Sequence, residues 1–303
     1  MELPSWFREA AGRTELYIKI GIVLLGASFP FTTIVQGGGW GFLEAFIIVA
    51  AGFATANVIG RAFGLEKRFI AVLGAGGSVC GVSAAIAVGS SVDAEKKQIG
   101  YVISLVVVFA LALVFIIPIV AKLLGFDPIV TGAWIGGSEL ADAAGLASAT
   151  LVGEKAVRAF LLVKLNRDVF IGFISFILAT LALTRWERKE GSNQARPYAG
   201  LIWERFPKFV LAFLLTSALV TALTASLGKP TVDAHLVAIL NAVRTWCFSL
   251  AFLCIGINTK FKDVKDIGAK PVVAFSAIVL VNFFVGCLAA WLFFGGVLGR
   301  PLS

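Results

Sequence analysis

The sequence predicts an all-α protein that crosses a membrane several times. The chain has 303 residues, of which 59% are hydrophobic and only 15% are Asp, Glu, Lys or Arg. A typical soluble domain has about 25% charged residues. Several apolar runs reach the roughly 20 residues that a helix needs to cross a hydrocarbon core of about 30 Å. A soluble chain of this length could not bury so much apolar surface, whereas a bilayer solvates it.

Nine hydrophobic segments follow one another, and we expect each to be a transmembrane helix within one integral membrane domain, 1–303. A basic cytoplasmic loop, 185–208, separates a first helical group, 1–184, from a second, 209–303. The segments are Leu16–Val35, Trp40–Gly60, Phe69–Gly89, Ile99–Val120, Pro128–Val152, Val157–Leu183, Phe206–Leu227, Leu236–Ile257 and Pro271–Val297.

Lysines and arginines predict the orientation. If every segment crosses once, most of the 26 Lys and Arg residues lie on the side of the N-terminus, while Lys96 and Lys97 lie on the other. Basic residues collect on the cytoplasmic side, so the N-terminus is expected inside the cell and the protein in the plasma (inner) membrane. This bias also favours treating the third and fifth segments as full crossings.

A weak internal repeat indicates two halves of opposite orientation. Its first copy lies around Leu25-Gly26 and its second around Ile255-Gly256, at a constant offset. In the nine-crossing topology the two copies run in opposite directions, which is a common building plan of secondary transporters. A chance match of abundant Gly and Phe residues is the alternative.

The third and fifth segments are interrupted by small residues, and we expect two discontinuous helices there. Each contains a Gly-Gly-Ser step, which would expose backbone groups that lipid cannot satisfy. Such breaks line the binding sites of many transporters, although close packing of helices through small residues is the alternative. The candidate donors are Ser78, Cys80 and Ser83 in the first break and Ser138 in the second.

Charged residues gather beside the second break. Glu139 and Asp142 have i, i+3 spacing and are expected on one helix face, either binding a coupling proton or cation or interacting with a helix dipole. Lys164 and Arg167 lie in the sixth segment and either neutralise carboxylates such as Asp168 or line an anion-attracting cavity. Elsewhere, we expect Glu44 and Asn57 near the two interfaces of the second segment, with a place along the transport pathway as the alternative.

No enzyme, metal or cofactor motif is present in the sequence. The chain has four Cys residues and one His, without a CxxC pair, and it lacks HExxH, GxSxG and a Walker lysine. Basic clusters interleaved with aromatics, which would favour nucleic acid, are also lacking. We therefore expect neither an enzyme nor a primary pump, with no metal, no cofactor and no nucleic-acid partner.

Five stretches together carry a family resemblance. They are Lys19–Gly26, Gly77–Ile86, Thr131–Ser138, Lys164-Leu165 with Arg167, and Ile255-Gly256. In this order, over nearly the whole chain, they resemble the YeiH-type sulfate exporter family, an uncharacterised transporter family related to cation/proton antiporters and bile-acid symporters. The Cys-Gly-x-Ser-Ala element at Cys80–Ala84 is the most specific part.

The resemblance implies inverted repeats, with discontinuous helices that cross in a mobile core domain against a scaffold. It also implies a set of substrate-binding residues. Carried over by position, these are Ser78, Cys80, Gly81 and Ser83, then Gly136, Gly137 and Ser138, then Lys164 and Arg167. Family members often have His-Asp after the second break. Here that His is absent, Glu139 is additional and Asp142 takes the place of the Asp, which leaves the substrate and the coupling ion open.

These observations predict a secondary transporter that exports a small anion, sulfate-like or organic, by alternating access. Coupling to a proton or cation would involve Glu139, Asp142 and Asp168. A cation/proton antiporter-like carrier that uses Glu139 and Asp142, and a non-transporting scaffold subunit, are the alternatives. Membrane lipids are expected partners, and self-association is left open. Relatives usually have further helices ahead of the first segment, so we expect a fragment or a shortened member.

Overall fold

The computed structural model describes residues 14–28, 38–186, 208–227, 232, 236–258 and 268–298, and every regular element in these ranges is helical. The predicted basic loop falls almost wholly outside them, as does much of the weak repeat. The elements are α2 (Thr14–Leu25), η1 (Gly26–Ser28), α4 (Gly38–Ala62), α5 (Lys67–Ser78), α6 (Val82–Ser91), α7 (Lys96–Leu123), α8 (Pro128–Ser138), α9 (Asp142–Val152), α10 (Glu154–Leu181), η2 (Ala182–Trp186), α12 (Lys208–Leu227), α14 (Ala238–Asn258) and α16 (Lys270–Phe294).

Three of the described helices, α4, α7 and α16, are long and apolar enough to cross a membrane. Helix α7 has 28 residues and would measure about 42 Å. Its exposed side includes Leu111 and Phe115, which are 67% and 58% exposed. A stripe of large apolar side chains at helical spacing is stable against lipid but not against water, so the fold is that of an integral membrane protein.

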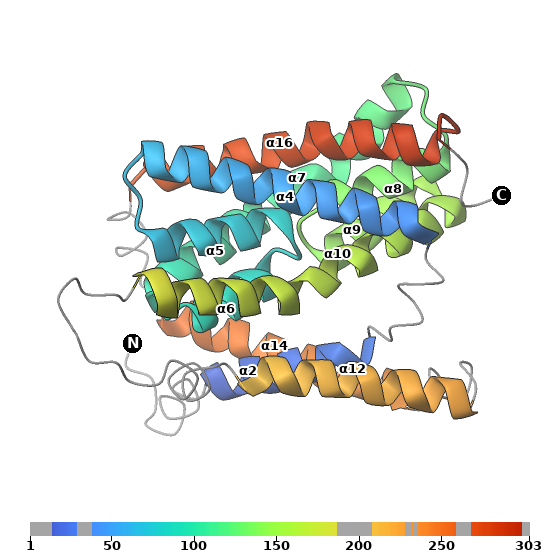
Figure 1. The fold of residues 1–303 in the computed structure, drawn as a ribbon. Helices are drawn as coiled ribbons and strands as arrows, with labels where there is room; N and C mark the ends of the chain where they lie inside the picture. The colour runs from blue at the N-terminus through green and yellow to red at the C-terminus, as the bar shows by residue number, and fades with distance from the viewer. Residues whose placement is uncertain are drawn as a thin grey trace, which may run out of the picture.

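Helices α5 and α6 form a hairpin rather than one crossing helix. Gly76 packs against Ala85, and Gly89 lies against Val72, so the two helices run antiparallel. At the open end of the hairpin, Nη1 of Arg68 donates a hydrogen bond to the carbonyl oxygen of Asp93 at 2.9 Å. The hairpin therefore begins and ends at the same end of the bundle, where α4 ends and α7 begins (Figure 1).

Helices α8 and α9 form a second hairpin, which begins at the opposite end, where α7 ends. Helix α8 runs parallel to α10, because Gly132 packs against Ala156 and Gly136 against Phe160. Since α9 ends only two residues before α10 begins, it must return to the side on which α8 started. Asp127 and Pro128 start α8 sharply, because the Asp127 side chain accepts hydrogen bonds from the amides of the first turn.

The two glycine-rich segments thus differ from the prediction, which made both full crossings. Helices α5 and α6 have 12 and 10 residues, or about 18 and 15 Å, and neither can cross a core of about 30 Å. The distribution of basic residues could not reveal the hairpins. Each hairpin returns the chain to the end from which it entered, and two such hairpins leave the helices after them in the same orientation as two full crossings would. Lys96 and Lys97 consequently lie at the same end as Arg61, Lys67 and Arg68, rather than opposite to them.

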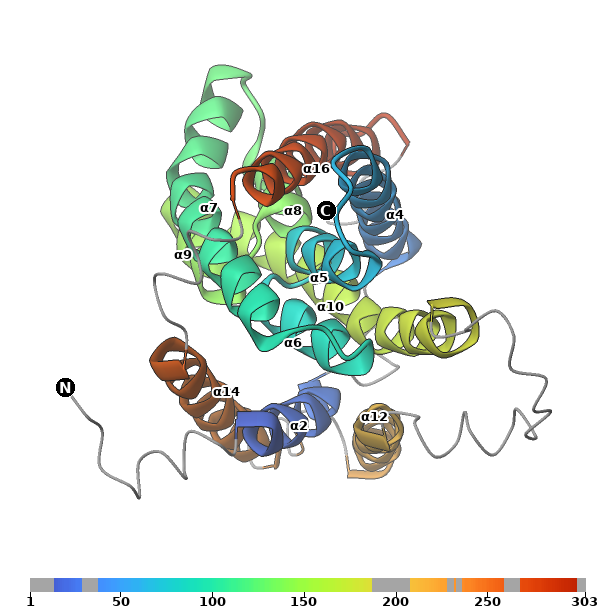
Figure 2. The ribbon, with the colours of Figure 1, turned by 90° about the vertical axis from the view of Figure 1, so that its left-hand side faces the viewer.

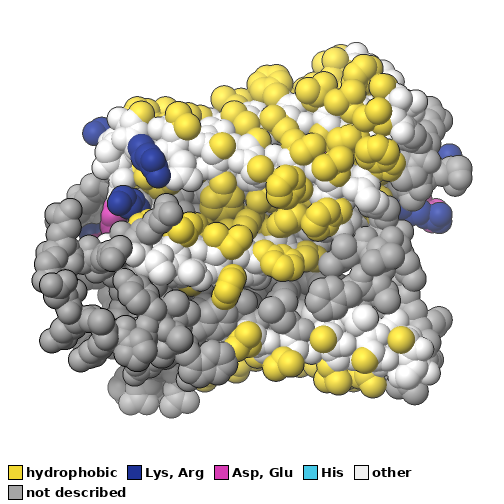
Figure 3. Space-filling view, in the orientation of Figure 1, with side chains coloured by type: hydrophobic (Ala, Val, Ile, Leu, Met, Phe, Trp, Pro, Cys, Tyr) yellow, Lys and Arg dark blue, Asp and Glu magenta, His cyan; other side chains and the backbone are white. Residues whose placement is uncertain are grey.

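On the face shown in Figure 3, the Lys and Arg side chains lie at the two ends of the molecule, with an apolar band between them. The basic end carries Arg61, Lys67, Arg68, Lys96, Lys97 and Lys270, and the opposite end carries Lys122, Lys155 and Arg158. Exposed charges at both ends and an apolar middle are the pattern that a bilayer imposes.

The helices pack as a main bundle and a smaller panel. The main bundle contains α4 to α10 and α16, with α5 and α8 buried along nearly their whole length. The panel consists of α2, α12 and α14, which pack on one another and lie along the side of the bundle that carries α6 (Figure 2). Ala27, Val220 and Val232 form a small apolar core within the panel, separate from the main core.

Candidate functional site

The tips of the two hairpins meet in the middle of the bundle. The first tip lies between Ser78 and Val82, and the second between Ser138 and Asp142. Gly81 has a φ of +64°, and a Cβ built on it would lie only 2.6 Å from the carbonyl oxygen of Leu140 in the other tip. A side chain at this position would be both strained and obstructed, so glycine allows the two tips to approach.

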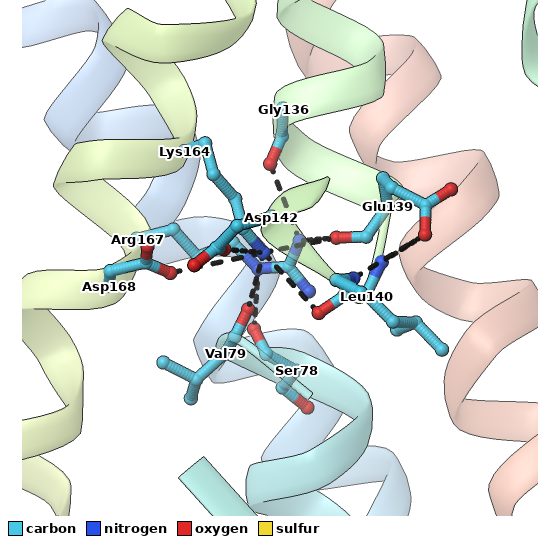
Figure 4. A network of polar contacts seen from close by, with 10 residues as sticks. Ser78, Val79, Gly136, Glu139, Leu140, Asp142, Lys164, Arg167 and Asp168 are labelled. Atoms are coloured by element: carbon cyan, nitrogen blue, oxygen red, sulfur yellow. Dashed lines mark hydrogen bonds and ion pairs between the residues drawn. The ribbon is translucent and has the colours of Figure 1, made fainter. Parts of the chain in front are cut away.

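Arg167, on α10, joins the two tips and is completely buried (Figure 4). Its Nε donates a hydrogen bond to the carbonyl oxygen of Ser78 at 2.8 Å. Its Nη1 donates to the carbonyl oxygens of Glu139 at 2.8 Å and Gly136 at 3.3 Å. Its Nη2 has no hydrogen-bond partner. One guanidinium thus satisfies carbonyls from the C-terminal ends of both α5 and α8, which have no partners within their own helices.

Lys164, one turn earlier on α10, also binds both tips. Its Nζ lies 3.5 Å from the carbonyl oxygen of Val79, and 3.3 Å and 3.4 Å from those of Glu139 and Leu140. It also forms ion pairs with Asp142 at 3.5 Å and Asp168 at 3.8 Å. The predicted i, i+4 pair of Lys164 and Asp168 is therefore present, and the ammonium caps helix ends as well (Figure 4).

Glu139 and Asp142 do not share a helix face, contrary to the prediction. Glu139 follows the end of α8 with extended backbone, and its side chain is fully buried. Its Oε1 accepts hydrogen bonds from the amides of Leu140 at 2.9 Å and Ala141 at 3.4 Å, whereas Oε2 has no partner. Asp142 begins α9 with a side chain that is 55% exposed. The i, i+3 rule for a shared helix face does not apply here, because the two residues are not in one continuous helix.

Asn282, on α16, holds both hairpins from the side and was missed by the sequence reasoning. Its Nδ2 donates a hydrogen bond to the carbonyl oxygen of Gly77 at 2.6 Å. Its backbone carbonyl oxygen accepts one from Ser138 Oγ at 2.9 Å. Asn282 is fully buried. The sequence feature that could have identified it is a single amide side chain in an otherwise apolar transmembrane helix.

Glu44, on α4, faces the interior of the bundle. It is fully buried and its carboxyl group lies against Gly137 of the second hairpin. Neither carboxyl oxygen has a hydrogen-bond partner. Asn57, more than three helical turns further along α4, is exposed and donates a hydrogen bond to the carbonyl oxygen of Phe53.

The remaining predicted residues divide into two groups. Ser78, Gly136 and Gly137 are buried among helices, where the glycines allow close packing and the Ser78 hydroxyl has no partner. Ser83, at the start of α6, is half-buried, whereas Cys80 is buried. Helix α6 also packs against α2 of the panel (Figure 2).

A cavity of about 310 Å³ opens at the basic end, away from the two tips. It lies between α4, α5 and the end of α10, and its polar lining includes Asn57, Arg61 and Lys67. Phe53 lines its deep side and also packs against Gly74 of α5. Within the described ranges, no three His, Cys, Asp or Glu side chains are grouped closely enough to hold a metal ion.

Comparison with known proteins shows that residues 9–275 match the family described as conserved hypothetical protein 698. A UPF0324 membrane protein of Nitratidesulfovibrio vulgaris is 32% identical over 300 residues, covering 96% of this chain and 51% of that protein. Another from Rhodopirellula baltica is 32% identical, covering 96% and 54%. A third, from Pseudomonas aeruginosa, is 26% identical, covering 93% and 75%. The chain thus spans about half the length of the first two. No solved structure matches.

Proposed function

The chain belongs to the family of membrane proteins described as conserved hypothetical protein 698, and on that premise we propose that it is a secondary transporter for a small anion. The cargo would be sulfate-like or organic, and it would move by alternating access. The resemblance drawn from the sequence to the YeiH-type family is confirmed by the family match, while the activity and its substrate are proposals.

One observation carries the proposal: two hairpins enter the bundle from opposite ends and meet at two buried cations. Each hairpin extends only part of the way across the protein. A ligand held between the tips would therefore have one hairpin between it and each end of the bundle. Backbone that is not helical is tolerated at membrane depth only where protein or a water-lined site surrounds it. Discontinuous elements that meet at mid-membrane are a recurrent site in secondary transporters.

The charges of the tips support an anion. Helices α6 and α9 both begin at the tips, and their first amide groups give each start a partial positive charge. Lys164 and Arg167 add two full positive charges between them. Glu139, Asp142 and Asp168 offset these charges, so binding of an anion is favoured when a carboxylate is protonated or turned away.

An inverted relation between two parts of the chain supports alternating access. Helices α4, α5 and α6 are followed by α7, α8 and α9, which run in the opposite directions with the Gly-Gly-Ser steps in matching places. Each copy contains one of the two helical hairpins. In this scheme the main bundle carries the ligand and the panel of α2, α12 and α14 is the scaffold, with separate apolar cores that favour relative movement.

The alternative of a cation/proton antiporter is favoured by buried carboxylate oxygens that accept no hydrogen bond. Oε2 of Glu139 has no hydrogen-bond partner, and Oδ1 of Asp168 has only its ion pair with Nζ of Lys164 at 3.8 Å. A proton or a small cation at these atoms would satisfy them, and the same atoms could couple cation movement to anion export. A non-transporting scaffold subunit explains neither the paired hairpins nor the buried charges, because both lower stability without aiding assembly.

Transport assays on the protein in liposomes test the proposal. We expect uptake of labelled sulfate or a related small anion, stimulated by a pH gradient, and a loss of at least about tenfold in Lys164→Gln, since each direct charge contact with an anion is worth about 1.5–3 kcal/mol. The matched control is Lys155→Gln, at the exposed start of the same helix. Uptake that is equal in both variants, or uptake of cations alone, would overturn the anion assignment.

The same proposal places the protein in the plasma membrane with its basic end in the cytoplasm, since positive residues collect on that side. Segments 9–13 and 187–207 lie outside the described residues, so the orientation rests on the described helix ends. Cysteine accessibility tests it: Asp93→Cys, at the basic end, should react only with permeant reagents in intact cells. A cysteine in place of Glu154, at the opposite end, should react with impermeant ones.

A further inference from the structure

Glu44 is a buried carboxyl group that the proposed anion site does not use. It lies on α4, fully buried, with Ile48 on the same helix and Gly137 of the second hairpin beside it. Both of its carboxyl oxygens lack a hydrogen-bond partner. Glu44 lies in the second turn of α4, and its carboxyl group is beside Gly137, the second-last residue of α8, close to the second tip.

A charged carboxylate in that position would be poorly stabilised. A carboxylate inside a transmembrane helix is costly to hold in its charged form. A buried ion without any hydrogen bond costs more, and such a group takes up a proton instead. The arrangement of atoms in this conformation is therefore that of a protonated Glu44.

Few charged groups face Glu44 from the helices packed against α4. From α10, Nη1 of Arg167 donates a hydrogen bond to the carbonyl oxygen of Gly136, which is next in sequence to the Gly137 that Glu44 contacts. Lys164 and Asp168 flank Arg167 on the same helix. From the second hairpin, Glu139 follows the end of α8, while Asp127 is at its far start. The charged residues of α5 and α16, Lys67, Arg68 and Lys270, lie at the basic end of the bundle. Arg167 is thus the buried cation available to an ionised Glu44.

Arg167 has one donor left for such a partner. Its Nε and Nη1 are occupied by backbone carbonyls of the two tips, whereas its Nη2 is buried without a hydrogen bond. Nη2 of Arg167 and the carboxyl group of Glu44 are thus both buried without a hydrogen-bond partner. An arginine and a carboxylate can form a strong ion pair, but this pair is not formed in this conformation.

We propose that Glu44 is the proton-coupling residue of the transporter and that its carboxylate competes with the anion for Arg167. When Glu44 releases its proton, the carboxylate pairs with Nη2 of Arg167 and the anion leaves. When Glu44 takes up a proton, that donor is free for the anion. One proton and one anion therefore bind together and move in the same direction. This inference rests on the proposed function and adds the coupling ion to it.

The test measures sulfate binding to the purified protein in lipid nanodiscs at several pH values. Linkage to one proton predicts that affinity falls by up to about tenfold for each pH unit above the titration of Glu44. Glu44→Gln keeps the shape of a protonated glutamate, and we expect it to bind sulfate with an affinity that no longer changes with pH. Glu95→Gln, an exposed carboxylate at the basic end, is the matched control and should behave like the parent protein.

Two further measurements separate this inference from the proposed function. One component of the infrared C=O band of protonated carboxyl groups should disappear in Glu44→Gln, and a hydrophobic carbodiimide should label Glu44 in the parent protein, whether or not sulfate binds. A protein that shows this band but binds none of a panel of anions would defeat the anion assignment and leave the proton site intact. Absence of the band and the label, or an unchanged pH dependence in Glu44→Gln, would overturn the inference.

Discussion

The two hairpins share a design but differ at their tips. In the second, the start of α9 is occupied by acidic side chains, because Glu139 accepts hydrogen bonds from two tip amides and Asp142 lies in the first turn. In the first, the turn that starts α6 contains no acidic residue. The two hairpins, each with a Gly-Gly-Ser step, therefore differ in charge at their tips. Acidic side chains offset the partial positive charge at the start of α9, whereas no acidic side chain does so at the start of α6.

This difference indicates a division of labour between the tips. The partial positive charge at the start of α6 remains available to an anion, together with the side chain of Ser83. The start of α9 is already compensated, so its carboxylates are better suited to binding protons or cations. Lys164 and Arg167 contact backbone carbonyls of both tips and so connect the two functions.

Removal of the guanidinium that joins the tips should have the largest effect. Arg167→Met leaves carbonyl groups of both hairpins unsatisfied, and we expect it to lower the free energy of unfolding by about 3–5 kcal/mol, with loss of transport. Thermal unfolding in nanodiscs measures this. Arg158→Met is the control on the same helix, because its ion pair with Glu154 is exposed and should be worth under about 1 kcal/mol. Equal melting temperatures for the two variants would contradict a bridging role.

A methyl group at the first tip should have the next largest effect. Gly81→Ala combines a positive φ with contact against the carbonyl of Leu140, and we expect a loss of stability of about 2–4 kcal/mol from strain and displacement of the tips. Gly64→Ala is the matched control, with a φ of +68° and open space around its Cβ, and should lose only about 1 kcal/mol. If both variants lose the same amount, the tips are not in contact through Gly81.

The sequence predicted the residues of the candidate site better than the path of the chain through the bundle. The Gly-Gly-Ser steps, Lys164 and Arg167 all come together at one place, because buried charges and helix breaks are both costly in lipid and satisfy each other. The first reversal was missed because Phe69–Gly89 is long enough to cross a membrane and its turn contains neither a charge nor a proline. The second was missed because Glu139, which lies in its turn, was assigned to one continuous helix with Asp142. Asn282 and Glu44 were missed as site residues because a single polar residue in an apolar helix does not reveal which distant segment it faces.

The two tip serines provide a smaller test of the comparison. Ser138 donates a hydrogen bond to Asn282, whereas the hydroxyl of Ser78 has no partner. We expect Ser138→Ala to destabilise the protein by about 1 kcal/mol and Ser78→Ala to be neutral or slightly stabilising. Thermal unfolding of the two variants side by side measures the difference. A larger loss in Ser78→Ala would mean that the first tip uses its hydroxyl in a way that the contacts of this conformation do not explain.

Asp142 should give the smallest change in stability and the sharpest distinction between the two transport mechanisms. Its side chain is half exposed and lies 3.5 Å from Nζ of Lys164, so Asp142→Asn should alter stability by under about 1 kcal/mol. If Lys164 attracts an anion, removal of this competing carboxylate lowers the KM for sulfate uptake by about two- to fivefold, the equivalent of under 1 kcal/mol. Asp93→Asn, an exposed partner of Arg68 at the basic end, should leave KM unchanged. A cation carrier predicts the reverse, because Asp142 would then be a ligand and its loss would weaken transport of the cation. The sign of the change in KM therefore separates an anion site that Asp142 restrains from a cation site that Asp142 helps to form.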